Sequence, residues 1–332
     1  MTQFAIAFPG QGSQAVGMLA ELAEQHAVIK ETFAEASQVL GYDLFALVMD
    51  GPVEDLNKTW RTQPALLTAS VALWRLWQQQ GGATPAVMAG HSLGEYSALV
   101  CSGALAFGDA VKLVELRGLA MQEAVPEGTG AMAAIIGLDN DSIAANCEKA
   151  APGQVVSPVN FNSPGQVVIA GHKEAVERAN VLMKESGAKR ALPLPVSVPS
   201  HCALMKPAAE KLAAALDGIE IKVPTIAVIN NVDVSCEQDP AAIKQALVRQ
   251  LFSPVRWSET VERMANEGVT LEIEMGPGKV LTGLAKRIDK PTSLTVNHIA
   301  QLPSVMISFN LAPGVALGEA VAAVPHKVYI HN

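Results

Sequence analysis

Residues 90–94 read GHSLG, a serine flanked by glycines at the G-x-S-x-G spacing. A short apolar segment, 85–89, precedes them, and residues 95–100 can continue as a helix. A serine at a sharp turn between a strand and a helix takes a strained backbone, and the glycines let neighbouring chain approach closely. The hydroxyl of Ser92 is then exposed beside the free N–H groups of a helix start, as acyl transfer through a serine ester requires. A glycine-bounded turn with no chemistry is the alternative.

The composition is that of a globular enzyme. The 332 residues suffice for one large core or two domains, and 49% of them are apolar and 17% charged. The net charge of −8 argues against nucleic acid as the main partner, because phosphate binding needs a basic surface. The longest apolar tract, 304–324, is interrupted by prolines and glycines, so no membrane span is expected. The four scattered cysteines indicate free thiols in a reducing cytoplasm, and neither they nor the histidines have metal-ligand spacing.

Strands alternate with long helices in two separate parts of the chain, residues 1–127 and 198–288. The apolar patterns predict strands at 4–8, 86–89, 225–229 and 270–274. They predict helices at 19–24, 28–40, 62–80, 107–125, 203–216, 241–251, 259–267 and 280–287. This alternation is typical of a mostly parallel sheet with helices on both faces. We therefore expect an α/β fold, with a large α/β-hydrolase-like domain built from both parts.

Residues 128–197 follow a different pattern and are expected to form an inserted small domain. The predicted order is strand, helix, strand, strand, helix, strand, at 131–137, 139–150, 155–160, 166–170, 173–186 and 189–194. This βαββαβ order is the ferredoxin-like pattern. A cleft between a large and a small domain is a natural place for an active site. Residues 289–332 form an atypical C-terminal tail to which we assign no function.

A nucleophilic serine needs a base, and His201 is the best candidate among seven histidines. It lies in the segment 198–201, where the small domain returns to the large one, and such a position can face Ser92 across the cleft. His91 adjoins Ser92, but consecutive side chains at a turn usually diverge, which favours a structural role for it. An ordinary loop histidine is the alternative for His201.

Five motifs then follow one another along the chain. They are FPGQG at 8–12, GHSLGE at 90–95, Arg117 within VELRG at 114–118, PSH at 199–201 and GPG at 276–278. Together they resemble the malonyl-CoA:acyl carrier protein transacylases of bacterial fatty acid synthesis, over about residues 1–288. The resemblance implies ping-pong transfer of a malonyl group from CoA to the phosphopantetheine thiol of acyl carrier protein, through a malonyl-serine ester. It implies no metal and no cofactor, since malonyl-CoA and the carrier are substrates.

The resemblance also implies roles at the matching positions. Ser92 is the nucleophile, and His201 takes the serine proton and returns it to the leaving thiol. The backbone N–H groups of Gln11 and Leu93 form an oxyanion hole. The backbone carbonyl of Gln250, in place of a carboxylate, orients the histidine. The alternative for Gln250 is a surface residue at a helix end.

Arg117 is implied to bind the free carboxylate of the malonyl group. A guanidinium matches a carboxylate with two parallel hydrogen bonds, which supports this choice physically. The alternative is an ordinary helical arginine that pairs with an acid such as Glu115 or Glu123. Gln63 and Asn162 resemble polar positions that line the cleft and contact substrate in this family.

Acyl carrier proteins are acidic, so an enzyme with a charge of −8 needs a local positive patch to dock one. The only Lys/Arg doublets are Lys189-Arg190 and Lys286-Arg287, and both are expected to flank the cleft. Solvated ends of helices or strands are the alternative. The resemblance suggests a cytoplasmic monomer. A serine thioesterase or esterase, for which Arg117 is incidental, and a carrier-binding scaffold with a dead site are the rival functions.

Overall fold

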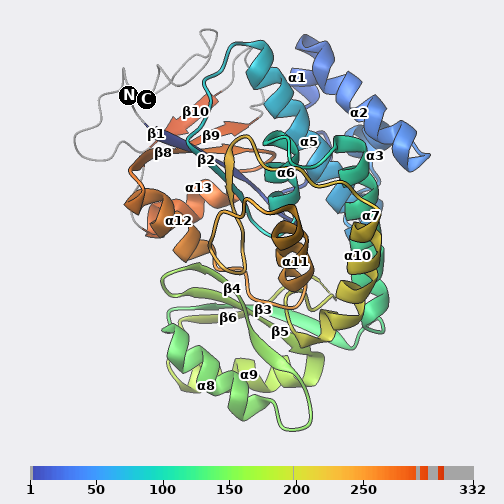
Figure 1. Ribbon diagram of the computed structural model, residues 1–332. Coiled ribbons are helices and arrows are strands. Elements are labelled where there is room, and N and C mark those ends of the chain that lie inside the picture. The colour runs from blue at the N-terminus through green and yellow to red at the C-terminus, as the bar shows by residue number, and fades with distance from the viewer. Residues whose placement is uncertain (1–2, 197, 289–291, 298–305, 310–332) are drawn as a thin grey trace.

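Two β-sheets organise the computed structural model, which describes residues 3–196, 198–288, 292–297 and 306–309. The larger sheet has the order β10-β9-β8-β1-β2-β7. Figure 1 labels all of these strands except β7. The strands of this sheet are β1 (Gln3–Phe8), β2 (Val87–Gly90), β7 (Ala227–Ile229), β8 (Val269–Met275), β9 (Thr292–Asn297) and β10 (Met306–Phe309). All neighbours in it are parallel except β9 and β10, which confirms the predicted α/β fold with a mostly parallel sheet.

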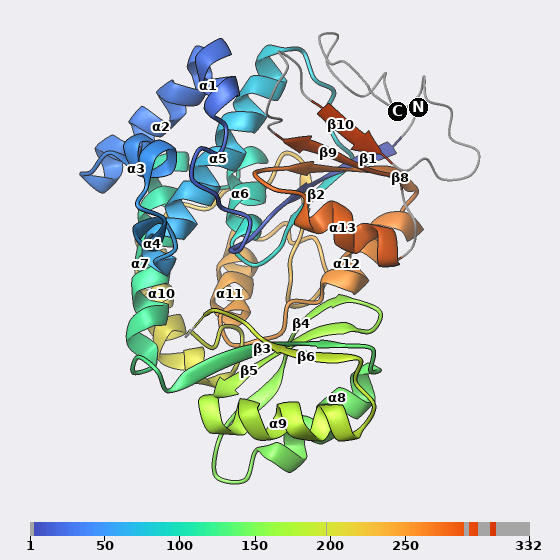
Figure 2. The same ribbon diagram turned by 180° about the vertical axis from the view of Figure 1, so that it is seen from behind.

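Helices cover both faces of this sheet, and the alternation of β1 shows how. The large side chains of Phe4, Ile6 and Phe8 face one core, with helices α2 (Ala27–Leu40), α5 (Thr59–Gln79) and α7 (Phe107–Ala124). Ala5 and Ala7 face a second core, with helices α12 (Trp257–Asn266) and α13 (Val280–Ile288) (Figure 2). The helices of this unit are α1 (Ala20–Gln25), α2 (Ala27–Leu40), α3 (Leu44–Asp50), α4 (Val53–Leu56), α5 (Thr59–Gln79), α6 (Gly94–Cys101), α7 (Phe107–Ala124), α10 (Lys206–Asp217), α11 (Pro240–Gln250), α12 (Trp257–Asn266) and α13 (Val280–Ile288).

The smaller sheet is antiparallel, with the order β4-β5-β3-β6. Its unit follows the expected order along the chain: β3 (Gly130–Ile136), α8 (Asn140–Ala150), β4 (Val156–Ser163), β5 (Gln166–His172), α9 (Lys173–Glu185) and β6 (Arg190–Pro193). Helices α8 and α9 cover the face turned away from the large unit (Figure 1). Asp139 begins α8 by accepting a hydrogen bond from the backbone N–H of Ser142 at 2.8 Å.

The elements differ from the sequence expectation in three places. Helices α3 and α4 were not expected, and both are short, at 7 and 4 residues. The helix expected at 203–216 begins as a 3₁₀ turn, Ala203–Met205, before α10. Of the tail at 289–332, the described segments are β9 and β10, which extend the large sheet, and the rest lies outside the described residues. No helix in the described ranges is both long and apolar enough to span a membrane.

Candidate active site

Ser92 lies at the turn between β2 and α6, with a φ of 52° that L-residues rarely adopt. The glycines on either side are required by close backbone contacts. A Cβ on Gly90 would lie 1.8 Å from the carbonyl carbon of Gly94, and one on Gly94 would lie 2.0 Å from the backbone oxygen of Phe8. The G-x-S-x-G spacing therefore lets α6 start directly over the carboxyl end of β1 and β2.

Ser92 and His201 face each other, with 2.8 Å between the serine Oγ and the histidine Nε2. The Nδ1 of His201 lies 2.7 Å from the backbone oxygen of Gln250. A carbonyl only accepts, so Nδ1 carries the proton and Nε2 is left to accept one from the serine. Burial, and then the charge of Arg117, lower the pKa of His201 to about 3, so the ring is neutral at pH 7. A neutral imidazole in this orientation can act as a general base.

Arg117 lies on α7 and is only 1% exposed. Its Nη1 donates to Gln63 Oε1 at 2.8 Å, and its Nη2 donates to Gln250 Oε1 at 2.9 Å and to Ser92 Oγ at 3.1 Å. All three acceptors are neutral, and no ion pair joins Arg117 to a carboxylate within the described part of the chain. Glu123, a suggested partner, pairs with Lys211 instead. A buried guanidinium without a counter-ion is suited to an anionic ligand.

A cavity of about 540 Å³, here called the catalytic cavity, joins these groups. Ser92, His201 and Arg117 all line it, and so do Gln11 and Leu93. The backbone N–H groups of Gln11 and Leu93 donate no hydrogen bond to other backbone groups in the described ranges. The walls of the catalytic cavity come from both units. Thr59 and Trp60 line it from the large unit, and Met132, Leu194, Pro195 and Val196 line it from the small one.

Gln63 and Asn162 are placed differently from the expectation, since neither lines the catalytic cavity. Gln63 is buried behind Arg117 and holds its guanidinium. Asn162, in β4 of the small unit, has its Oδ1 2.8 Å from the Nε2 of His91. His91 thus connects the serine turn to the small unit, consistent with the structural role expected for it. Both outcomes depend on contacts between residues more than fifty positions apart, which motif spacing does not reveal.

The two basic doublets do not reach the catalytic cavity either. Lys189 and Arg287 instead line a separate depression of about 450 Å³, and Arg287 Nη1 donates to Gln166 Oε1 at 2.6 Å. The expectation that both doublets flank the cleft stays a prediction. Lys189 and Arg190 stand at the start of β6, whereas the catalytic cavity is lined by residues 194–196, beyond its other end.

Asn231 is a site residue that sequence reasoning missed. Its Oδ1 accepts from the backbone N–H of Ser92 at 2.7 Å, and its Nδ2 donates to the backbone oxygen of Gly90 at 2.7 Å. Its own N–H donates to the carboxylate of Glu95 at 2.9 Å. The signal available was its place two residues after the end of strand β7, because functional groups gather at the carboxyl ends of parallel strands.

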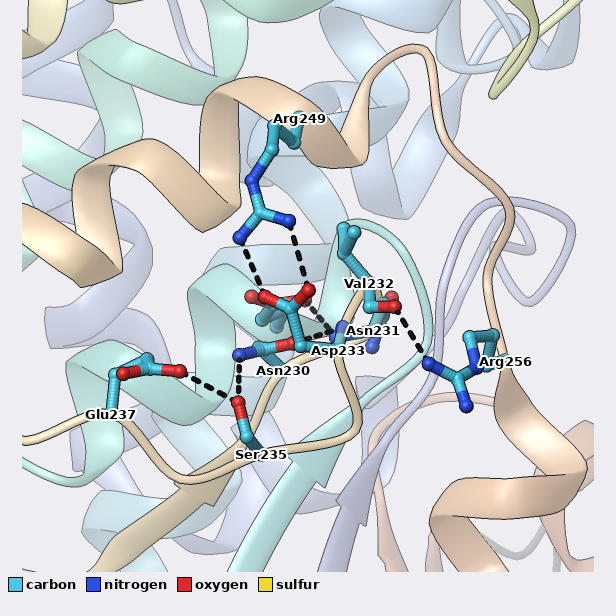
Figure 3. Close-up of polar contacts among 9 residues, drawn as sticks. Asn230, Asn231, Val232, Asp233, Ser235, Glu237, Arg249 and Arg256 are labelled. Atoms are coloured by element: carbon cyan, nitrogen blue, oxygen red, sulfur yellow. Dashed lines mark hydrogen bonds and ion pairs between the residues drawn. The ribbon is translucent and has the colours of Figure 1, made fainter.

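The loop around Asn231 is itself held by polar contacts (Figure 3). Arg249 donates two hydrogen bonds to Asp233, from Nη1 to Oδ1 at 2.8 Å and from Nη2 to Oδ2 at 2.5 Å. Asn230 donates to Ser235 at 3.0 Å, and Arg256 donates to the backbone oxygen of Val232 at 3.2 Å. These contacts fix the loop that supports the serine turn. Within the described ranges, no group of three or more His, Cys, Asp or Glu side chains is arranged to hold a metal ion.

Comparison with known proteins adds independent information. A family model described as "Acyl transferase domain" matches residues 6–299, beyond residue 288, where the motif resemblance was expected to end. The malonyl CoA-acyl carrier protein transacylase of Salmonella typhimurium is 69% identical over 307 residues, which is 92% of this chain and 99% of that protein. The enzyme of the same name from Bacillus subtilis is 50% identical over 291 residues, 87% of this chain and 92% of that protein.

Solved structures agree with these relatives. The acyl carrier protein S-malonyltransferase of Vibrio cholerae has a TM-score of 0.88 at 71% identity, over 90% of this chain and 98% of that one. A malonyl-transacylase solved in complex with a type II PKS acyl-carrier protein also has a TM-score of 0.88, at 66% identity, over 89% of this chain and 95% of that one. The second structure shows such a fold with a carrier protein bound to it.

Proposed function

The chain belongs to the acyl transferase family and to its malonyl-CoA:acyl carrier protein transacylases, and we propose that it transfers the malonyl group through an ester on Ser92. The enzyme moves malonyl from CoA to acyl carrier protein. One observation carries the proposed mechanism. In a single cavity, Ser92 Oγ lies 2.8 Å from a buried neutral imidazole and 3.1 Å from a buried guanidinium that forms no ion pair with any carboxylate of the described residues.

In the first half-reaction, the Oγ of Ser92 attacks the thioester carbonyl of malonyl-CoA while Nε2 of His201 takes the hydroxyl proton. The carbonyl oxygen gains negative charge, and the N–H groups of Gln11 and Leu93 are the proposed donors that stabilise it. The carbon–sulfur bond then breaks, and His201 returns the proton to the departing CoA sulfur. The malonyl group is left as an ester on Ser92.

In the second half-reaction, the phosphopantetheine thiol of acyl carrier protein takes the place that CoA has left. His201 accepts the thiol proton, the sulfur attacks the ester carbonyl, and the proton passes to Ser92 Oγ as the ester bond breaks. The backbone oxygen of Gln250 keeps Nδ1 of His201 protonated in both halves. Both substrates bring their own thiol chemistry, so the proposed reaction needs no metal or bound cofactor.

Arg117 is proposed to hold the free carboxylate of the malonyl group. The carboxylate would supply the anionic partner that this guanidinium lacks in the described part of the chain. An acetyl group would leave Arg117 buried and unpaired, and breaking such a pair costs on the order of 3–5 kcal/mol. Acyl selectivity is therefore electrostatic in origin. Holding the ester at both ends in a partly closed cavity also limits attack by water.

Several finer proposals accompany this mechanism. The order β3-α8-β4-β5-α9-β6 supports a ferredoxin-like small domain over 128–197, and the parallel sheet with its serine turn supports an α/β-hydrolase-like large domain.

The free thiols of the described cysteines favour a cytoplasmic protein. We also propose a monomer, and docking of the acidic carrier at Lys189-Arg190 and Lys286-Arg287, of which Lys189 and Arg287 lie in one depression.

Intact-mass spectrometry tests the central proposal. After incubation with malonyl-CoA, the protein should carry one malonyl group, which peptide mapping places on Ser92 and which addition of acyl carrier protein removes. Ser92→Ala should carry none while melting at the same temperature. A malonyl group on another residue would overturn the proposed mechanism. Release of free malonate at the same rate with and without the carrier would indicate a thioesterase instead.

A further inference from the structure

Glu95 is a buried carboxylate that the proposed mechanism does not use. It lies three residues after Ser92, in the first turn of α6, and is 2% exposed. Its Oε2 accepts from the backbone N–H of Asn231 at 2.9 Å and from Gln250 Nε2 at 2.8 Å, and these are its side-chain hydrogen bonds within the described ranges. Its position is therefore defined by two groups of the site itself.

Gln250 connects Glu95 to the groups that contact substrate. Its Nε2 donates to Glu95 and to the backbone oxygen of Ser92, the latter at 3.0 Å, and its Oε1 accepts from Arg117 Nη2 at 2.9 Å. An amide can adopt two orientations that differ by a flip. A carboxylate only accepts hydrogen bonds and a guanidinium only donates them, so Glu95 and Arg117 together select one orientation. In the flipped amide, an NH₂ group would face the guanidinium.

We propose that Glu95 is a positioning residue, which orients the side-chain amide of Gln250 and thereby keeps the guanidinium of Arg117 beside Ser92. The proposal rests on the role of Arg117 in the proposed function. It assigns Gln250 two separate tasks, with the backbone oxygen holding His201 and the side chain holding Arg117. Loss of Glu95 should disturb recognition of the acyl carboxylate and leave the reactivity of the serine and histidine in place.

Burial raises the pKa of Glu95 to about 7, with hydrogen bonds from Gln250 and Asn231 and the charge of Arg117 opposing the rise. The hydrogen bonds, and not a full negative charge, are therefore the expected basis of its effect. Glu95→Gln separates the two, because a single amide oxygen at the place of Oε2 can still accept both bonds. Glu95 also borders a small cavity that Asn230 and Glu237 line.

The test compares Glu95→Ala, Glu95→Gln and Gln250→Ala in the full-length protein. The first readout is the ratio of malonyl to acetyl loading on Ser92 from the two CoA esters. The second is the rate of Ser92 labelling by a fluorophosphonate, which has no carboxylate and so reports the reactivity of the serine without recognition of an acyl carboxylate. Glu95→Ala and Gln250→Ala should each lower the loading ratio about tenfold or more, the scale of one lost hydrogen bond to a charged group. In Glu95→Ala, labelling should change by less than about threefold, and Glu95→Gln should keep the wild-type ratio within about twofold.

Glu272→Gln is the matched control, since it removes another buried carboxylate, on β8, away from the catalytic cavity, and should leave the ratio unchanged. An unchanged ratio in Glu95→Ala, with a collapsed ratio in Arg117→Ala, would overturn the proposal and leave the proposed function intact. A ratio that survives in Arg117→Ala would instead remove the carboxylate role of Arg117. Equal losses in Glu95→Gln and Glu95→Ala would assign the effect to charge and overturn the positioning role. If Glu95→Ala does not fold, Gln250→Ala decides, and an unchanged ratio there rejects the proposal.

Discussion

Arg117 Nη2 donates a hydrogen bond to Ser92 Oγ at 3.1 Å, so the proposed anchor for the acyl carboxylate lies directly beside the proposed nucleophile. The same hydroxyl oxygen lies 2.8 Å from Nε2 of His201. Only a short acyl chain can place its carboxylate on Arg117 and its thioester carbonyl at Ser92 together. This relationship explains how one cavity can prefer a three-carbon diacid. A substitution of Arg117 is therefore the most direct test of the proposed selectivity.

Arg117→Ala should lower the rate of malonyl loading by about a hundredfold or more, because a buried pair worth about 3–5 kcal/mol is lost. Acetyl loading should fall far less, since an acetyl group has no carboxylate to bind. The measurement is kcat/KM with malonyl-CoA and with acetyl-CoA. Arg117→Lys keeps the charge without the planar fork and should lie between the two. Equal losses for both esters would make Arg117 a structural residue.

Asn231→Ala should slow loading of every ester by the same factor, unlike a change at Arg117. The substitution leaves the N–H of Ser92 and the carbonyl of Gly90 without their partner, at a cost of about 1–3 kcal/mol for each buried group. The strained turn is then no longer held. The rate of fluorophosphonate labelling of Ser92 and the melting temperature of the protein should both fall. Wild-type labelling in a well-folded Asn231→Ala protein would show that the turn holds its shape without this side chain.

The buried carboxyl group of Glu272 should make the stability of the fold depend on pH. Glu272 is 2% exposed, and its two carboxylate oxygens have no hydrogen-bond partner within the described residues. Burial, and then the neighbouring Glu274, raise its pKa from the ordinary 4.5 to about 8. The folded state therefore binds this proton more tightly than the unfolded state. The contribution of the protonated carboxyl to the stability of the fold is complete below pH 4.5 and is lost as the pH rises through about 8.

Glu272→Gln should consequently melt at a higher temperature than the wild type at pH 8 to 9, and the difference should shrink toward pH 5. Differential scanning calorimetry across this range provides the measurement. Glu274 is the internal comparison, because its carboxylate accepts from the N–H groups of Leu281 and Thr282 and from the Thr282 hydroxyl. Glu274→Gln should destabilise the protein at both ends of the range. A pH-independent difference for Glu272→Gln would mean that this group does not titrate as described.

Charge reversal at the basic doublets tests carrier docking. Lys189→Glu with Arg190→Glu, and Lys286→Glu with Arg287→Glu, should each raise the KM for acyl carrier protein several-fold through lost electrostatic attraction. Malonyl loading from CoA should stay at the wild-type rate, because none of the four residues lines the catalytic cavity. The effect should weaken at high salt. An unchanged KM for the carrier would place its docking surface elsewhere.

Local patterns predicted most of the fold. The period of the apolar residues located β1, β2, α5 and α7 to within three residues at each end, and the turn chemistry at Asp139 correctly marked the start of α8. Helices α3 and α4 were not predicted, because helices of 7 and 4 residues are too short to show a helical period of apolar residues. The extension of the large sheet by β9 and β10 was not predicted either, and these strands pair with β8 and with each other.

The candidate site was less accessible to sequence reasoning. Ser92 follows from a local motif, but His201 was chosen mainly for its place at the junction of two domains. Asn231 meets the serine turn across 139 residues, and Gln250 meets Glu95 across 155. Contacts of this kind leave no periodic pattern in one sequence. The same limit explains why Asn162 was assigned to the cleft when its side chain contacts His91.

The order of the chain has a consequence for how activity arises during folding. The small unit occupies residues between β3 and β6, and His201 comes only eight positions after β6 ends. The imidazole can reach Ser92 only after the chain has left the first half of the large unit, built the small one and returned. The proposed catalysis thus depends on the chain up to and past residue 201, and a nascent or shortened chain that stops before this crossing displays Ser92 without its proposed base.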